Sequence, residues 1–148
     1  MEKRFQIVTD SSCDLPQALA DELDLAVLPL HVLIGEHTYA NYLDGREIGF
    51  REFYDKLRDG ERATTSAVNV SEFTAVMEEK LKAGLDILFI GFSSGLSTTY
   101  QPCALSTSRQ SSSGSIILTC TCCTSHTAII MPPGVPRSGF TRRAAYVP

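Results

Sequence analysis

Two stretches rich in hydroxyl side chains are the part of this sequence best suited to hold a ligand. Residues 92–101 read Phe-Ser-Ser-Gly-Leu-Ser-Thr-Thr-Tyr-Gln and directly follow the apolar run 87–91, and residues 63–71 contain Thr65 and Ser66. Neither stretch contains an acid, a base or a metal ligand. Hydroxyls, together with N–H groups at a helix N-terminus, donate hydrogen bonds to an anion without adding a competing charge. We therefore interpret the stretches as a cradle for an anion.

The elements that must position these turns alternate between strand and helix. Apolar runs predict strands at residues 5–9, 25–34, 37–40 and 87–91. Caps and apolar spacings of three and four predict helices after Pro16, over 49–57 and over 71–83. This order indicates an α/β fold with a mostly parallel sheet, flanking helices and a small hairpin arm. The turn after residue 91 then leaves the carboxyl end of a strand, where open α/β sheets bind ligands.

Two local details carry further expectations. Asp14 is placed to cap the helix that follows Pro16, with Leu19, Leu23 and the alanines on its apolar side. Pro29 lies within the apolar run 25–34 and predicts an edge position or an irregularity there, because proline cannot donate to a strand ladder.

Composition narrows the class of protein. The 148 residues are 43% hydrophobic and carry a net charge of -4, with no cluster of Lys or Arg, which argues against a nucleic-acid partner. No segment has the length and apolarity of a signal peptide or a membrane span. We expect a cytoplasmic protein of one-domain size, without a membrane span.

The sequence changes character after residue 101. Residues 1–101 contain nine Lys and Arg and all 17 Asp and Glu, whereas residues 102–148 contain four Arg, no acid and four of the five Cys. We expect an α/β domain over 1–101 and an atypical, irregular tail over 102–148, with one short strand at 115–119.

Metal and cofactor chemistry find little support. His31 and His37 flank a hairpin at a spacing that is not a metal pattern, and Cys120, Cys122 and Cys123 lack the paired spacing of a zinc site. We expect no metal and no cofactor, and reduced thiols rather than disulfides.

Three turns at strand ends carry a family resemblance. Residues 9–16, the pair Thr65-Ser66 and residues 93–101 resemble, in order and wording, the motifs of the DegV family of bacterial fatty-acid-binding proteins. The resemblance covers about residues 4–101. It implies a cytoplasmic carrier that is not an enzyme, holds one long-chain fatty acid in a deep apolar tunnel and presents it to a separate fatty acid kinase.

The resemblance also implies site residues. Thr65 matches the Thr of the family's Thr-Ser turn, and Ser97 matches the third Ser of its Ser-Ser-Gly-Leu-Ser turn, so both would donate to the fatty-acid carboxylate. Ser66, Ser94 and Thr98 are weaker candidates, since hydroxyl residues before helices are usually caps. The family usually has Gln-Pro after its Thr-Ser and Gly at the position of Thr98, and this sequence has neither.

Two further expectations concern what this chain can do. Family members run to nearly twice this length, with a second domain that closes the tunnel and supplies an Arg and a His. Residues 102–148 do not match that half, so we expect a truncated version whose tail is a frameshifted or disordered segment, with weak or absent fatty-acid binding. The alternative is a phosphate- or acyl-transfer enzyme acting on a small molecule, using Asp10 and the hydroxyl cradle; an Asp at this strand end is also commonly a structural cap.

Overall fold

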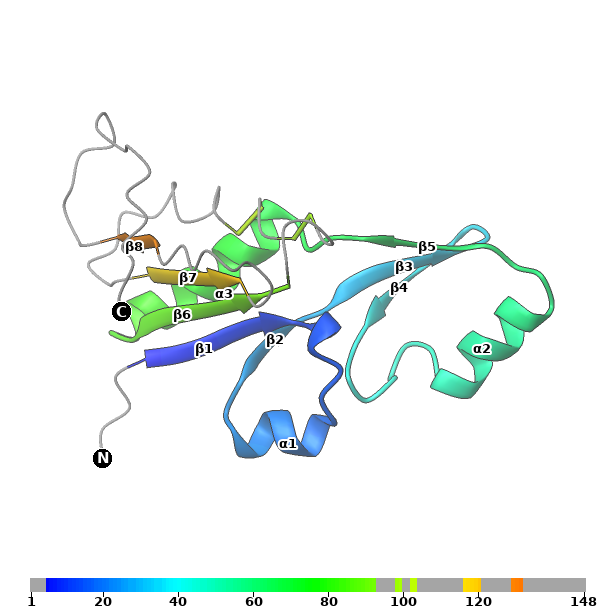
Figure 1. Ribbon diagram of the computed structural model, residues 1–148, viewed down its shortest axis with the longest axis horizontal. Helices are drawn as coiled ribbons and strands as arrows, with labels where there is room; N and C mark the ends of the chain where they lie inside the picture. The colour runs from blue at the N-terminus through cyan, green and yellow to red at the C-terminus, as the bar shows by residue number, and fades with distance from the viewer. Residues whose placement is uncertain (1–4, 93–97, 100–101, 104–115, 121–128, 132–148) are drawn as a thin grey trace.

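The computed structural model describes residues 5–92, 98–99, 102–103, 116–120 and 129–131 (Figure 1). Its elements, in chain order, are β1 (Phe5–Asp10), the 3-10 turn η1 (Ser11–Cys13), α1 (Gln17–Glu22), β2 (Ala26–Leu28), β3 (Leu30–Ile34), β4 (His37–Asn41), α2 (Phe50–Arg58), β5 (Ala63–Ser66), α3 (Val70–Lys82), β6 (Asp86–Gly91), β7 (Ile116–Cys120) and β8 (Ile129–Met131).

A five-stranded sheet in the order β2-β1-β6-β7-β8 forms the centre of the molecule. Every pairing in it is parallel except that of β7 with β8. The predicted α/β class with a mostly parallel sheet is therefore confirmed.

The order of these strands places a switch point between β1 and β6. The chain passes from β1 to β2 on one side and later returns to place β6 on the other side of β1. The Thr9 hydroxyl donates to the Ile90 carbonyl at 2.8 Å and joins the two strands near their carboxyl ends. In open α/β sheets the crevice at such a point is where ligands bind.

A second sheet, in the order β4-β3-β5, extends away from the first together with α2 (Figure 1). The run 25–34, predicted as a single strand, is divided at Pro29: β2 pairs with β1, whereas β3 pairs with β4 and β5. The missing N–H of proline explains the break. Thr65 and Ser66, predicted to lie in a turn, instead belong to β5 and pair with β3.

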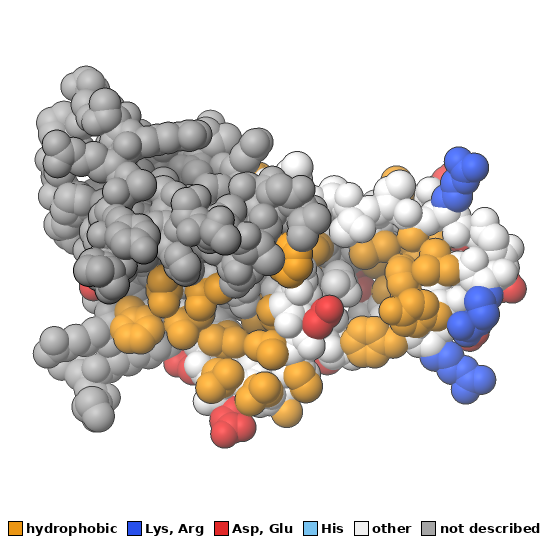
Figure 2. Space-filling view, viewed as in Figure 1, with side chains coloured by type: hydrophobic (Ala, Val, Ile, Leu, Met, Phe, Trp, Pro, Cys, Tyr) orange, Lys and Arg blue, Asp and Glu red, His pale blue; other side chains and the backbone are white. Residues whose placement is uncertain are grey.

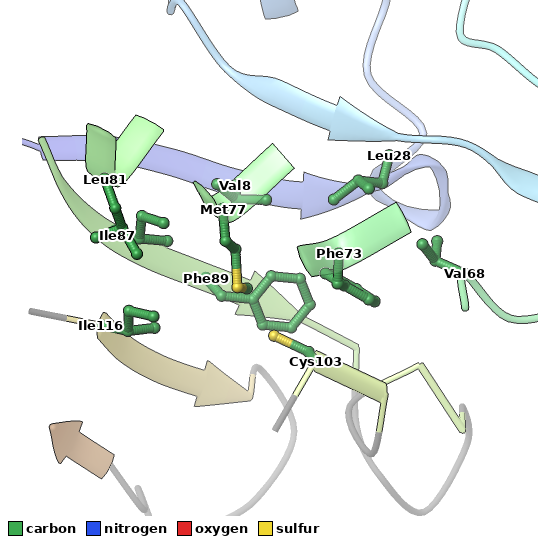
Figure 3. Close-up of a cluster of buried hydrophobic side chains, with 10 residues drawn as sticks. All are labelled: Val8, Leu28, Val68, Phe73, Met77, Leu81, Ile87, Phe89, Cys103 and Ile116. Carbon is green, nitrogen blue, oxygen red and sulfur yellow. The ribbon is translucent and has the colours of Figure 1, made fainter. Parts of the chain in front are cut away.

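The core lies between the five-stranded sheet and α3 (Figure 3). Phe73, Met77 and Leu81 of α3 are buried against Ile87 and Phe89 of β6. The rings of Phe73 and Phe89 meet edge to face, with centroids 5.3 Å apart. The predicted apolar face of the helix over 71–83 is thus the face that packs on the sheet.

The first two helices differ from expectation. Asp14 does not cap α1; it adopts a left-handed conformation, with φ of 52°, at the end of η1. Helix α1 buries Ala20, whereas Leu19 and Leu23 are exposed. Helix α2 has an apolar face, as predicted, but buries none of its residues, and hydrophobic side chains gather on the surface shown in Figure 2.

The tail contributes two strands. The predicted strand at 115–119 is β7, which pairs in parallel with β6 from Ile116 opposite Ile87 to Cys120 opposite Gly91. Residues 129–131 form β8, which was not predicted, so the expectation of an otherwise irregular tail does not hold there. Ile116 is buried in the α3-facing core.

Candidate functional site

A cavity of about 400 Å³ opens where β1 and β6 end. Its lining comes from η1, the start of β3, the end of β5 and the segments that follow β5 and β6: Ser12, Leu30, Thr65, Ser66, Ala67, Phe92, Thr98 and Thr99. The volume lies within the range of small-molecule sites, roughly 300–1,000 Å³. Three apolar side chains and several hydroxyls thus share one cavity at the switch point of the sheet.

The cavity brings together three of the five predicted site residues. Thr65 and Ser66 reach it from β5, and Thr98 reaches it from the segment after β6. Ser94 and Ser97 lie outside the described residues.

Other lining residues were not predicted. Ser12, Leu30 and Phe92 lie next to strand ends, and the sequence does not state which strand ends are neighbours. The signal available for Ser12 was its place two residues after the end of β1, because the carboxyl ends of adjacent parallel strands meet at one edge of the sheet. Only the pairing of β1 with β6 makes that signal interpretable.

Asp10 lies behind the wall of this cavity rather than in it. Its side chain is 1% exposed, and Oδ1 accepts both the N–H of Ser12, at 2.9 Å, and the Ser12 hydroxyl. These contacts make Asp10 the cap of η1. A carboxylate in this position has no access to a substrate, which argues against the alternative in which Asp10 reacts with a small molecule.

The adjoining Ser11 ties the same turn to the second sheet. Its Oγ accepts from the Leu30 N–H at 3.0 Å and from Asn41 Nδ2 at 3.2 Å. Ser11 is 1% exposed, so both bonds are shielded from water. The junction at Pro29 is therefore held by the turn that also carries Ser12.

The N-terminus of α3, near Ala67, is closed by its own residues. Asn69 Oδ1 accepts from the Glu72 N–H, and Glu72 Oε2 accepts from the Asn69 N–H, each at 2.9 Å. This capping box uses donors that an anion would otherwise find at a helix start. Among the described residues, hydroxyl groups are therefore the main hydrogen-bond donors at the cavity.

The described wall of the cavity is uncharged, and one acid, Asp10, is buried behind it. None of the described lining residues carries a formal charge. Burial, and secondarily the negative charge of Asp10, raises the pKa of the Cys103 thiol well above its usual range.

A second, smaller cavity of about 210 Å³ lies between α1 and the base of the hairpin. Arg46 lines it, but its guanidinium bonds Asp44 at 2.9 Å and lies 4.4 Å from the centre of the Tyr42 ring. The same bond lowers the pKa of Asp44. Because the guanidinium of Arg46 is already paired with Asp44, this cavity is the weaker candidate site for binding a carboxylic acid.

The described residues contain neither a metal-binding cluster nor a membrane-spanning helix. In the parts of the chain that the structure describes, no three His, Cys, Asp or Glu side chains cluster as metal ligands would. Among the helices in those parts, none has both the length and the apolar character needed to cross a membrane.

Comparison with known proteins identifies the family. The family model described as "Uncharacterised protein, DegV family" matches residues 4–128, which includes β7. This chain belongs to the DegV family. The match confirms the resemblance seen in the motifs and continues beyond residue 101.

Individual relatives support the same family assignment. A DegV domain-containing protein of Clostridium perfringens is 42% identical over 98 residues, covering 66% of this chain and 33% of the relative. A DegV domain-containing protein of Clostridium acetobutylicum is 40% identical over 103 residues, covering 68% of this chain and 35% of the relative. The chain thus spans about a third of the length of these relatives.

Solved structures show the same fold. A DegV family protein from Thermus thermophilus, described by its fatty acid binding, is 30% identical with a TM-score of 0.65, over 80% of this chain and 40% of that chain. DegV of Bacillus subtilis, described as a fatty acid binding protein, is 28% identical with a TM-score of 0.68, over 79% of this chain and 40% of that chain.

Proposed function

We propose that this chain binds a long-chain fatty acid, with the carboxyl end in the cavity at the ends of β1 and β6. The observation that carries the proposal is the meeting of Thr65 and Thr98, from two separate motifs, in one cavity at the switch point. The fatty-acid binding described for the relatives from Thermus thermophilus and Bacillus subtilis supports the choice of ligand.

The chemistry of the lining suits an amphipathic ligand. A carboxyl group removed from water needs hydrogen-bond donors, and the hydroxyls of Thr65 and Thr98 are available at the wall. Leu30, Ala67 and Phe92 supply apolar surface for the first part of the acyl chain. Each enclosed methylene contributes about 0.8 kcal/mol.

Ser97 is proposed as the second main donor beside Thr65. This assignment rests on the match of Ser97 to the family's motif. Ser66, Ser94 and Thr98 are proposed as secondary contacts; of these, Ser66 and Thr98 line the cavity.

We further propose that the bound acid is presented to a fatty acid kinase in the cytoplasm and that this chain performs no catalysis itself. The domain over 1–101 and the acid-free tail over 102–148 motivate the hypothesis of a frameshift after residue 101. Sequencing the gene and the expressed protein tests it, and one intact frame through the tail would refute it.

Equilibrium dialysis with radiolabelled palmitic acid tests the binding proposal. We expect Thr65→Val, which keeps the shape but removes the hydroxyl, to weaken binding about tenfold, the value of one hydrogen bond to an acid. Thr64→Val is the matched control, because Thr64 is also exposed on β5 but does not line the cavity. No palmitate binding by the wild-type chain, or equal losses in both variants, would contradict the proposal.

A further inference from the structure

The cavity of about 400 Å³ is built by two parts of the fold that are paired separately. Leu30 and Thr65 reach it from the three-stranded sheet. Ser12 and Phe92 reach it from the chain just beyond β1 and β6 of the five-stranded sheet. Along the chain, a single residue, Pro29, lies between β2 of one sheet and β3 of the other. The relative positions of the lining groups therefore depend on the contacts that hold the two sheets together.

One buried hydroxyl joins these two parts at the end of the second sheet. Leu30 of β3 and Asn41 of β4 lie opposite each other in the antiparallel ladder. Ser11 Oγ accepts from the Leu30 N–H at 3.0 Å and from Asn41 Nδ2 at 3.2 Å. A serine oxygen can accept two hydrogen bonds, so these donors use its full accepting capacity. Ser11 is 1% exposed, and water therefore cannot readily replace either donor.

Asn41 is not among the described residues that line this cavity, yet it is bonded to a residue whose neighbours are. Its side chain lines the smaller cavity of about 210 Å³, whereas Leu30 and Ser12 line the larger one. A shift of Ser11 would move Ser12 through the backbone and Leu30 through the hydrogen bond. Leu30 begins β3, which pairs with β5, so the position of Thr65 depends on the same contact.

We propose that Asn41 is a positioning residue for fatty-acid binding. Through its bond to Ser11 it holds the turn η1 and the start of β3 in the relative arrangement that the carboxyl end of the acid requires. It acts without touching the ligand. Groups that are fixed before the ligand arrives do not have to be ordered on binding, so the contact favours affinity. The inference rests on the proposed function and adds a residue outside the cavity to it.

Two substitutions of Asn41 separate hydrogen bonding from packing. Asn41→Leu has nearly the size of asparagine but no polar atom, so it breaks the bond to Ser11. Asn41→Asp has no N–H to donate, but its carboxylate, ionised at about pH 7.5, can accept the proton of Ser11 and restore a bond between the two side chains. A positioning role therefore predicts that aspartate rescues binding and leucine does not.

Equilibrium dialysis with radiolabelled palmitic acid at about pH 7.5 measures the effect. We expect Asn41→Leu to weaken binding about fivefold, the value of one hydrogen bond, and Asn41→Asp to stay within about twofold of the wild-type chain. Ile87→Val is the control for lost stability, since Ile87 is buried near the start of β6, away from the cavity at its end. Its palmitate affinity should equal that of the wild-type chain. Equal losses in Asn41→Leu and Asn41→Asp, or in Asn41→Leu and Ile87→Val, would overturn the inference.

A double-mutant cycle tests whether Asn41 acts through Ser11. Asn41→Leu added to Ser11→Ala should cause little further loss of palmitate affinity, because the acceptor is already gone. Additive losses, or an affinity that Asn41→Leu leaves unchanged, would overturn this inference alone. An absence of palmitate binding by the wild-type chain would overturn the proposed function and this inference with it. If circular dichroism shows that Asn41→Leu does not fold, Asn41→Ala takes its place in both tests.

Discussion

The imidazole Nε2 of His31 lies 2.9 Å from Oε1 of Glu72, and this pair joins the three-stranded sheet to the first turn of α3. The other oxygen of Glu72 accepts from the Asn69 N–H and closes the helix cap. One carboxylate therefore stabilises both the start of α3 and the position of β3. Since β5 pairs with β3, the same contact helps to hold Thr65 at the cavity.

Replacing Glu72 should separate these two roles. We expect Glu72→Ala to lower the free energy of unfolding by about 1–2 kcal/mol, through loss of the cap and of the histidine pair. Glu72→Gln should lose less than half as much, because glutamine also serves in a capping box. Urea denaturation measures both. Equal losses in the two variants would show that the charge, and not the cap, dominates.

Gly91 is required by the position of the Phe89 ring. A Cβ on Gly91 would lie 2.5 Å from Cε1 of Phe89, whose side chain is fully buried. We expect Gly91→Ala to lower the free energy of unfolding by about 1–3 kcal/mol, as overpacking does. A double-mutant cycle with Phe89→Leu provides the control: the cost of the added methyl should shrink when the ring is removed. An unchanged cost would contradict the steric explanation.

Cys103 should make stability depend on pH in the alkaline range. Its pKa is raised in the folded protein, so its contribution is fully present below the unfolded thiol pKa of about 8.5. Above that value the unfolded chain loses the proton while the folded chain keeps it, and the free energy of unfolding falls as pH rises toward the folded pKa, by up to about 1.4 kcal/mol per pH unit.

Urea denaturation at about pH 7.5 and about pH 9.5 measures this loss. We expect it to be smaller in Cys103→Ala than in the wild-type chain. Cys13→Ala is the matched control for the substitution, because Cys13 is also a free cysteine but is only partly buried. The explanation fails if Cys103→Ala keeps the full wild-type loss.

Ser11 should be the most sensitive residue of the η1 turn. Ser11→Ala leaves the Leu30 N–H and Asn41 Nδ2 without their shared acceptor in a buried junction, and we expect a loss of about 1–3 kcal/mol in the free energy of unfolding. Asn41→Ala removes only one of the two donors and should cost less. Thermal denaturation of the two variants measures the difference, and a larger loss in Asn41→Ala would contradict this account.

The spacing of apolar residues along the sequence predicted the structure well where a helix buries one face against the sheet. The spacing of Phe73, Met77 and Leu81 predicted both α3 and the face it buries, because a helix repeats every 3.6 residues whatever it packs on. The same reasoning was only partly right for α1: Ala20 of the expected apolar side is buried, whereas Leu19 and Leu23, four apart, are exposed. The sequence of a short helix does not show which of its faces packs against the sheet.

The candidate site was likewise only partly predictable from the sequence. Motif wording identified Thr65, Ser66 and Thr98, and the cavity contains all three. Ser12 and Phe92 lie in stretches named from the sequence but were not proposed as site residues, because their relevance depends on β1 lying beside β6, across about 80 residues of chain that carry no local sign of the pairing.

The sequence by itself determined most of the alternation of strands and helices, the hydroxyl-rich stretches and the family, because each depends on residues close together in the chain. Tertiary structure decided that Pro29 divides one apolar run between two sheets, that Thr65 belongs to a strand, and that Asp10 fixes the proton of Ser12. Those features arise from strand neighbours and buried hydrogen bonds between distant segments, and such long-range pairings exist only once the chain has folded.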